Sequence, residues 1–228
     1  MKKLLKTAFL KSLPVMAGYV VLGFGFGILA VKNGISFWWA AAMSVFIYAG
    51  SMQYVAVSLL TAGAGLISVA LTTLMVNARH LFYSFSMLRP YKHTGRKKPY
   101  LIFGLTDETY SLVYKGRAPE EGLSFRKYAF WVTLLNQCYW ILGTLLGALI
   151  GELVSFNTTG IDFAMTALFI TVFVDQWKDT KDHVPALVGV SVTIACLLLY
   201  GTRGFLVRSM LIISLILALR VLGGKRRG

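Results

Sequence analysis

Apolar segments long enough to cross a lipid bilayer fill most of this 228-residue chain. About 20 predominantly apolar residues in a helix span the ~30 Å hydrocarbon layer. Segments that reach or approach this length are Ser12–Val31, Phe37–Ala62, Leu66–Leu88, Tyr128–Gly151, Ile161–Trp177, Val184–Tyr200 and Phe205–Leu222. Because lipid offers no hydrogen bonds to the backbone, segments of this length must form helices. The sequence therefore predicts an all-α, polytopic bundle of transmembrane helices, a single integral membrane domain over residues 1–228.

The composition excludes the common soluble classes of protein. Hydrophobic residues make up 57% of the chain and charged residues 14%, whereas a soluble domain has about 25% charged residues. A chain this apolar cannot hide its apolar surface from water, and disorder requires low hydrophobicity instead. Soluble enzymes and disordered proteins are therefore excluded.

The net charge of +14 is concentrated beside the apolar segments. Basic residues gather in the N-terminal residues 1–11, in the polar region 89–127 and in the tail 223–228. Positive charge in such positions holds a loop on the cytoplasmic side and attracts anionic membrane lipid. We therefore expect these three segments, and with them both termini, to be cytoplasmic. A nucleic-acid partner is not expected, because it would require a continuous basic face.

The segment Phe37–Ala62 is expected to be broken near Gly50. As one ordinary crossing it would place the basic residues 89–98 outside the cell, against the usual distribution of positive charge. Each half, about 12 residues, reaches only ~18 Å as a helix. A broken or re-entrant element that enters and returns on the same side reconciles the length with the charge. A single kinked helix is the alternative.

Ionisable side chains within apolar segments are the first candidate functional residues. Such a group costs about 3 kcal/mol or more at the bilayer centre unless it is paired or hydrated. Asn77, Arg79 and His80 lie within Leu66–Leu88, and Asn77 and His80 share one helix face. We expect a polar sector that faces the interior of the bundle. The alternative is that Arg79 extends to the membrane surface.

The break itself offers a second group of candidates. Gly50 and Ser51 precede an apolar half-helix, whose free N–H groups and dipole favour a bound anion such as a carboxylate. Transporters use broken helices in this way near the middle of the membrane. Gln53 would add an amide contact. Ser51 as an ordinary cap at a kink is the alternative.

Two adjacent carboxylates, Asp107 and Glu108, form the third group. They could serve proton coupling, bind an amine, or form an ion pair with Arg79. An equally good alternative is a purely structural role, in which Thr106 caps a helix whose first turn contains both acids.

No enzyme signature accompanies these residues. The sequence has no HExxH, GxSxG, P-loop or dinucleotide-binding motif, and its two cysteines lack metal-binding spacing. We therefore expect no catalytic residue, no metal site and no cofactor. A transporter of small solutes is the simplest prediction, with an intramembrane enzyme using His80 and Asp107 as a less favoured alternative.

Glycines in two apolar segments have the spacing of close helix packing. Gly23 and Gly27 make one GxxxG pattern, and Gly143, Gly147 and Gly151 make two that overlap. Helices in lipid associate where small residues let their backbones approach. These positions predict helix–helix contacts, within the chain or with a partner.

Four stretches, in order, resemble the AzlC family of branched-chain amino acid permeases. They are Tyr48–Gln53, Asn77–Tyr83, Phe103–Glu108, and Asp162–Ala164 with Ala167–Ile170. The resemblance covers approximately residues 10–200 and includes the candidate residues named above. It implies a protein of the bacterial cytoplasmic (inner) membrane, the large subunit of a branched-chain amino acid exporter. It also implies a small hydrophobic AzlD-type subunit as partner.

The resemblance implies leucine, isoleucine, valine or methionine as the exported solute. Because the sequence has no ATP-binding motif, we expect an ion gradient to supply the energy. A passive channel for small solutes is the alternative function.

Overall fold

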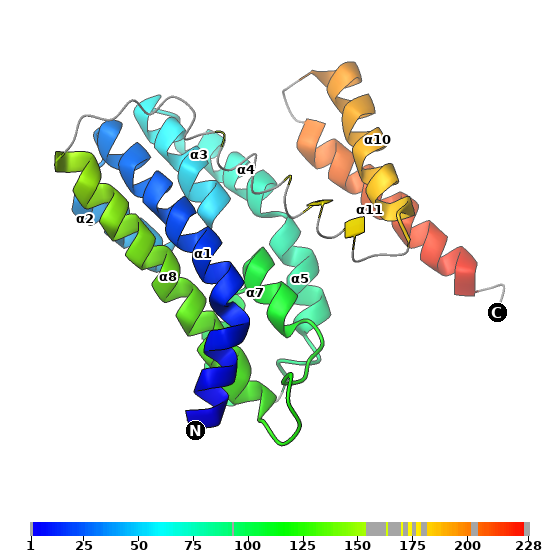
Figure 1. Cartoon of the computed structure of the whole chain (residues 1–228). Coiled ribbons are helices and arrows are strands. Elements are labelled where there is room, and N and C mark those ends of the chain that lie inside the picture. The colour runs from blue at the N-terminus through cyan, green and yellow to red at the C-terminus, as the bar shows by residue number, and fades with distance from the viewer. Residues whose placement is uncertain are drawn as a thin grey trace. The chain divides into compact units, whose positions relative to one another are not determined.

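The computed structural model describes residues 2–92, 94–153, 182–201 and 205–225, together with a few residues between 163 and 178. The chain divides into two compact units, Met1–Thr166 and Ala167–Gly228, which are described separately. Every regular element of the described residues is a helix (Figure 1), so the all-α prediction is confirmed. Most of the predicted span Ile161–Trp177 lies outside the described residues.

The first unit is built on two long parallel helices, α1 (Lys2–Lys32) and α8 (Phe125–Leu153). They pack along the glycines that the sequence singled out. A Cβ atom on Gly23 would lie 2.7 Å from a backbone oxygen of α8, and one on Gly143 would lie 2.5 Å from a backbone oxygen of α1. The two backbones therefore touch, as small residues permit in lipid. The predicted close packing is confirmed, because the glycines of the α1 pattern pack against the glycine-containing face of α8.

The segment predicted to be broken forms two half-helices, α2 (Phe37–Phe46) and α3 (Gly50–Thr61). Tyr48, in the turn between them, has a φ of 45° and is the one non-glycine residue with positive φ in the described part of the chain. A buried tyrosine holds this conformation only where its surroundings enforce it. The predicted break is therefore confirmed.

The two half-helices form a hairpin that begins and ends at the same end of the α1–α8 pair. Tyr48 packs edge-on against Tyr19 in the middle of α1, with ring centroids 6.5 Å apart. From there α3 returns toward the C-terminal end of α1: the Tyr54 hydroxyl donates to the carbonyl oxygen of Leu22 at 2.7 Å, and its ring contacts Phe26. This is the path of a re-entrant element.

The next predicted span is bent rather than straight. It consists of α4 (Leu66–Asn77) and α5 (Arg79–Met87), and the axes on either side of the break differ by 47°. The polar residues that the sequence analysis placed inside one helix therefore lie at its break. As a result, Arg79 belongs to the first turn of α5.

The polar region 89–127, expected as a cytoplasmic loop region, contains a second hairpin. Its helices are α6 (Lys98–Phe103) and α7 (Asp107–Val113). The ring of Phe103, at its tip, lies 6.2 Å from the ring of Tyr48 at the tip of the first hairpin. The cytoplasmic location of the remainder of this region stays a prediction.

The second hairpin enters from the opposite end of the bundle. Leu101 and Val113 belong to a buried cluster with Ala8 and Tyr128, near the starts of α1 and α8. Its tip reaches further along α8, where Gly104 lies against the side chain of Thr133. The two hairpins thus approach from opposite ends, and their tips meet midway along α1 and α8.

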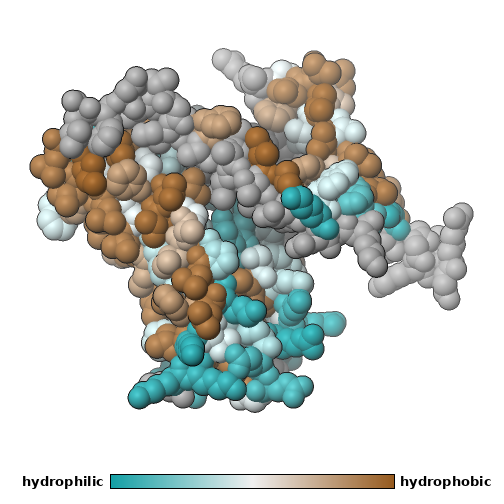
Figure 2. All heavy atoms as spheres, in the orientation of Figure 1, coloured by the Kyte–Doolittle hydropathy of each residue, from teal (hydrophilic) through white to brown (hydrophobic). Residues whose placement is uncertain are grey.

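The surface of the first unit suits a lipid environment. Among the described residues, α1 and α8 are long and apolar enough to cross a membrane, and α4 with α5 is a third candidate if the bent pair counts as one span. Figure 2 shows hydrophilic side chains gathered at the end that carries the N-terminus, with apolar side chains along the flanks. Leu66 is 88% exposed and Trp38 is 78% exposed. Large apolar side chains on an outer surface are typical of contact with lipid.

The second unit contains α10 (Val184–Tyr200) and α11 (Phe205–Lys225), which pack against each other. They correspond to the last two predicted spans. Asp182, just before α10, forms an ion pair with Arg220 near the end of α11 at 2.8 Å. This pair fixes one end of the helix hairpin.

Candidate functional site

Three helices of the first unit begin at one place midway along the bundle. Ser51 lies in the first turn of α3, and Arg79 and Asp107 are the first residues of α5 and α7. Arg79 Nη2 donates to Ser51 Oγ at 2.8 Å, and Arg79 Nη1 lies 2.8 Å from Asp107 Oδ2. Arg79 therefore connects the first hairpin to the second, so the alternative in which it extends to the membrane surface is wrong.

The start of α3 is fixed by close packing against α8. A Cβ atom on Gly50 would lie 2.9 Å from the ring of Trp140, so this position needs glycine. The preceding Ala49 has no side chain that can cap the helix, which leaves the N–H groups of the first turn for another acceptor. Ser51 lies within that turn, so the alternative in which it only caps a kink is also wrong.

Asn77 and His80 lie on either side of the break between α4 and α5. His80 Nδ1 lies 3.2 Å from the carbonyl oxygen of Asn77, the last residue of α4. The His80 ring packs edge-on against Tyr83, which in turn stacks on Tyr110 of α7 at 4.8 Å. The predicted polar sector therefore faces α7, in the interior of the bundle.

Gln53 lies apart from the other candidates. Its side chain is fully buried, its Oε1 accepts a hydrogen bond from Trp140 Nε1 at 3.0 Å, and its Nε2 donates to Ser44 Oγ at 3.2 Å. Both ends of the amide thus hold α2, α3 and α8 together. The reason is helical geometry, because residues two apart, such as Ser51 and Gln53, point to nearly opposite faces.

Glu108 has different partners from its neighbour Asp107. The Tyr19 hydroxyl of α1 donates to Glu108 Oε2 at 2.6 Å and lies 2.6 Å from Thr106 Oγ1. Thr106 also caps α7, since its Oγ1 accepts a hydrogen bond from the N–H of Thr109. The capping role expected as an alternative is therefore present together with the ion pair to Arg79.

A second layer of hydroxyl and amide groups supports Glu108. Thr106 Oγ1 donates to Thr109 Oγ1 at 3.1 Å, and Thr109 Oγ1 accepts from Asn136 Nδ2 of α8 at 3.0 Å. Sequence analysis did not single out Tyr19 or Thr109. For Tyr19 a signal existed: it is a hydroxyl group in the middle of an apolar span, where such a group needs a partner.

The site keeps unused hydrogen-bond acceptors despite its burial. Asp107 Oδ1 and the side-chain oxygen of Asn77 are both buried, and no group in the described part of the chain donates a hydrogen bond to them. Buried polar atoms normally have partners, so these two oxygens call for a further donor, such as water or a bound solute. The site thus combines a cation at Arg79, a carboxylate with a free oxygen, and the uncapped N-terminus of α3. This combination is complementary to a small molecule that carries both charges.

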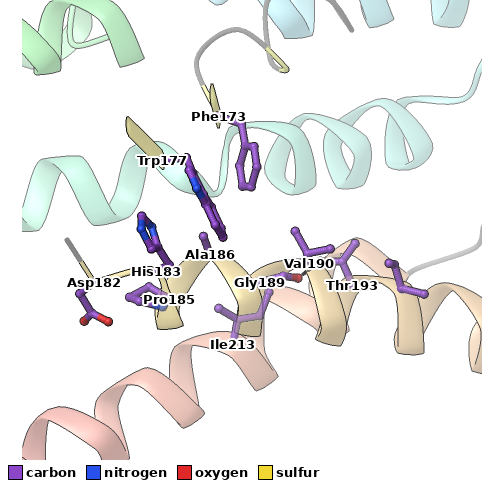
Figure 3. Close-up of a pocket in the computed structure, with 11 residues that line it drawn as sticks. Phe173, Trp177, Asp182, His183, Pro185, Ala186, Gly189, Val190, Thr193 and Ile213 are labelled. Carbon is purple, nitrogen blue, oxygen red and sulfur yellow. Dashed lines mark hydrogen bonds between the residues drawn. The ribbon is translucent and has the colours of Figure 1, made fainter. Parts of the chain in front are cut away.

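The second unit contains a pocket of different character. Its volume is about 620 Å³, and Figure 3 shows that its wall includes Phe173 and Trp177 on one side and α10 on the other. The rings of Trp177 and His183 stack at 4.2 Å, and Asp182, which also lines the pocket, is already paired with Arg220. The pocket is therefore mainly apolar and aromatic. Within the described residues, no group of three His, Cys, Asp or Glu side chains is placed to hold a metal ion.

Comparison with known proteins agrees with this arrangement. Residues 14–154, which include both hairpins, all of α8 and α1 from Pro14 onward, match the model of the AzlC protein family. The chain belongs to the AzlC family. The family match thus contains all the candidate residues named above.

Curated relatives of this AzlC-family chain cover most of its length. It is 43% identical to the branched-chain amino acid transport protein AzlC of Bacillus subtilis, over 91% of this chain and 82% of that protein. It is also 43% identical to an uncharacterized membrane protein of Helicobacter pylori, over 95% of both chains. The inner membrane protein YgaZ of Escherichia coli is 28% identical over 78% of this chain and 76% of its own. No solved structure matches the chain.

Proposed function

We propose that this AzlC-family protein exports branched-chain amino acids across the bacterial cytoplasmic membrane. The observation that carries the proposal is the position of Arg79, which bonds Ser51 of one hairpin and Asp107 of the other. Two broken elements whose tips meet near the middle of a membrane domain are typical of transporter binding sites. The Bacillus subtilis relative, a branched-chain amino acid transport protein, supports the same class of solute.

In this proposal the carboxylate of the amino acid binds Arg79 and the N-terminal turn of α3. Arginine binds carboxylates with two parallel hydrogen bonds, and a helix N-terminus adds N–H groups and a positive dipole. Ser51 then donates its own hydroxyl to the carboxylate. Gly50 permits the approach, because a larger residue would displace the start of α3 from Trp140.

The ammonium group of the amino acid binds Asp107 and the side-chain oxygen of Asn77. Both offer buried oxygens that accept no hydrogen bond from the described residues. A zwitterion inserted between Arg79 and Asp107 replaces one ion pair by two, so the site stays electrically balanced. A solute with only one of the two charges leaves either Arg79 or Asp107 without a partner, which is costly in a buried site. His80 holds the chain at the break beside Asn77.

The transport system in this proposal has two subunits and is driven by an ion gradient. The partner is a small hydrophobic AzlD-type membrane subunit, which the family resemblance implies. The apolar outer flanks of α1 and α4 offer surface to such a subunit as well as to lipid. Both termini are cytoplasmic in this arrangement, because the basic segments flank the first and last spans.

The test is export from cells fed dipeptides of leucine, isoleucine, valine or methionine. Intracellular and external amino acids are measured over time in cells with and without this chain, each with and without the adjacent small hydrophobic protein. If the proposal is right, the amino acid leaves the cells faster only when both chains are present. It also continues to leave when its external concentration is higher than its internal one. Clearance that stops when the concentrations are equal would support a passive channel. Unchanged clearance, with both proteins present in the membrane, would refute the proposed function.

A further inference from the structure

We propose that Glu108 is the proton-carrying group that couples transport to the proton gradient, whereas Asp107 serves the substrate. This inference rests on the proposed function and assigns its energy source to one side chain. It starts from an asymmetry between two adjacent carboxyl groups: Asp107 has a guanidinium partner at 2.8 Å, whereas among the described residues the side chain that bonds the Glu108 carboxylate is the Tyr19 hydroxyl and not a cation. A carboxylate held by a cation keeps its charge, whereas one held only by a hydroxyl can gain and lose a proton.

Among the described residues, titratable groups face Glu108 from α1, the first hairpin, α5 and α7. Tyr19 of α1 bonds its carboxylate, and Tyr48 faces it from the tip of the first hairpin. Arg79 and Tyr83 face it from α5, and Asp107 precedes it on α7. Arg79, the one cation of this set, is already bonded to Asp107 and Ser51. The remaining neighbours are phenols and a second acid, and neither adds positive charge.

The hydroxyl chain beside Glu108 can satisfy the carboxyl group in either protonation state. When Glu108 is charged, the Tyr19 hydroxyl donates to Oε2 at 2.6 Å. When Glu108 is protonated, its O–H donates to the Tyr19 oxygen, and the Tyr19 hydroxyl turns to Thr106 Oγ1, 2.6 Å away. Thr106 in turn donates to Thr109. Only hydrogens rotate, so neither state leaves a buried polar group unsatisfied.

The location of Glu108 connects this proton site to the substrate site. Asp107 and Glu108 begin the same helix, so a shift of α7 that accompanies binding at Arg79 also moves Glu108 relative to Tyr19. Glu108 takes its proton from a hydronium ion when the site is open to the outside, so one O–H bond forms on the carboxylate as one breaks on the hydronium ion, and it gives the proton back to water when the site is open to the cytoplasm. Inward movement of this proton then drives outward movement of one amino acid. Intramembrane carboxyl groups carry protons in this way in many pumps and transporters.

The test is Glu108→Gln in the full chain, reconstituted into liposomes with the small subunit if export requires it. Two quantities are measured with radiolabelled leucine: uphill accumulation driven by a pH gradient, and exchange of labelled for unlabelled leucine without a gradient. We expect Glu108→Gln to lower the driven accumulation ratio to about one, and to leave exchange within about twofold of wild type, because exchange needs no net proton movement. Glu121→Gln, at an exposed loop carboxylate, is the matched control and should retain both activities.

Any other result overturns either the coupling role of Glu108 or the proposed function. Full uphill accumulation by Glu108→Gln overturns the proposal, and so does loss of exchange together with accumulation in a folded variant, which would place Glu108 in the substrate site. A wild-type protein that exchanges leucine but ignores the pH gradient overturns the coupling and leaves the proposed function standing. A wild-type protein that moves no amino acid overturns both. If Glu108→Gln does not fold, Tyr19→Phe removes the hydroxyl chain instead and should lower accumulation several-fold while exchange persists.

Discussion

The α1–α8 contact and the meeting point of the two hairpins lie side by side but are held together differently. Along α1 and α8 the backbones touch through glycines, and the contact is set by shape. At the hairpin tips the contacts are hydrogen bonds and one ion pair, and some buried oxygens have no partner among the described residues. The first region specifies how the helices pack, and the second is where the proposed function places the amino acid.

This difference predicts two classes of variant. Substitutions along α1 and α8 should reduce the amount of folded protein, because a packed backbone contact cannot accommodate added atoms. Substitutions at the hairpin tips should reduce transport more than folding, because their partners are side chains that can rearrange. The following experiments test whether the two classes are separate.

The largest effect on folding is expected from Gly27→Leu. A Cβ at Gly27 would collide with the carbonyl oxygen of Thr144 in α8, and overpacking of a rigid contact costs about 3 kcal/mol or more. We expect loss of most of the protein from the monodisperse peak in detergent chromatography. Gly18→Leu, on the same helix but with open space around its Cβ, is the matched control and should yield wild-type amounts. Equal yields of the two variants would contradict the parallel α1–α8 packing.

Arg79→Gln should have the largest effect on transport with a limited effect on folding. It removes the cation that bonds both hairpins, and loss of about 2 kcal/mol of charge-assisted bonding lowers apparent substrate affinity about 30-fold. The measurement is the concentration dependence of leucine exchange, together with yield and thermal stability in detergent. Arg126→Gln, at an exposed arginine at the start of α8, is the control.

The partner of Arg79 allows a sharper version of this experiment. Arg79→Gln leaves Asp107 without its ion pair, so we expect a lower Tm, and Arg79→Gln with Asp107→Asn should recover part of that loss. The double variant should not recover transport, because both charges that the amino acid needs are absent. Recovery of transport along with stability would mean that the pair is only structural, and that the substrate binds elsewhere.

Sequence patterns predicted the individual elements of this fold better than the contacts between them. The glycine spacing, the break in the first hairpin and the polar group around Arg79 were visible, because each depends on residues close together in the chain. The pairing of Gly23 with α8 joins residues about 120 positions apart, and nothing local specifies it. The second hairpin was not predicted. Its helices are six and seven residues long, and helices this short do not show a clear apolar periodicity.

Candidate residues were predicted where one side chain alone is costly in lipid. Arg79 and Asp107 are such residues, and the structure brings them together. Gln53 has the same polarity, yet its contacts with Trp140 and Ser44 hold helices together. Only the direction of the side chain on α3 separates its role from that of Ser51, and that direction depends on where the helix begins.

Ser51→Ala should have a moderate effect on transport and almost none on folding. It removes one hydroxyl that accepts from Arg79 at 2.8 Å and that donates to the substrate in the proposed function. Loss of one such hydrogen bond corresponds to about a threefold to tenfold lower apparent affinity for leucine. Ser58→Ala, an exposed position on the same helix, should match the wild type. An effect on yield larger than the effect on affinity would assign Ser51 to the structural class.

The smallest effect is expected at Glu120, which lies outside both regions and ties the loop before α8 to the start of α1. A hydrogen bond from Thr7 at 2.6 Å and the ammonium group of Lys3 at 3.2 Å lower the pKa of Glu120. A carboxyl group with a lowered pKa stabilises the folded protein above its unfolded pKa, and that contribution is lost as the pH falls through the folded value.

Glu120→Gln should therefore lower the Tm slightly at pH 7, and the difference from wild type should shrink on acidification below about pH 4. High salt should shrink the part due to Lys3 as well, because an exposed ion pair is screened. A difference that instead grows on acidification would mean that another group, and not this carboxylate, connects the loop to α1.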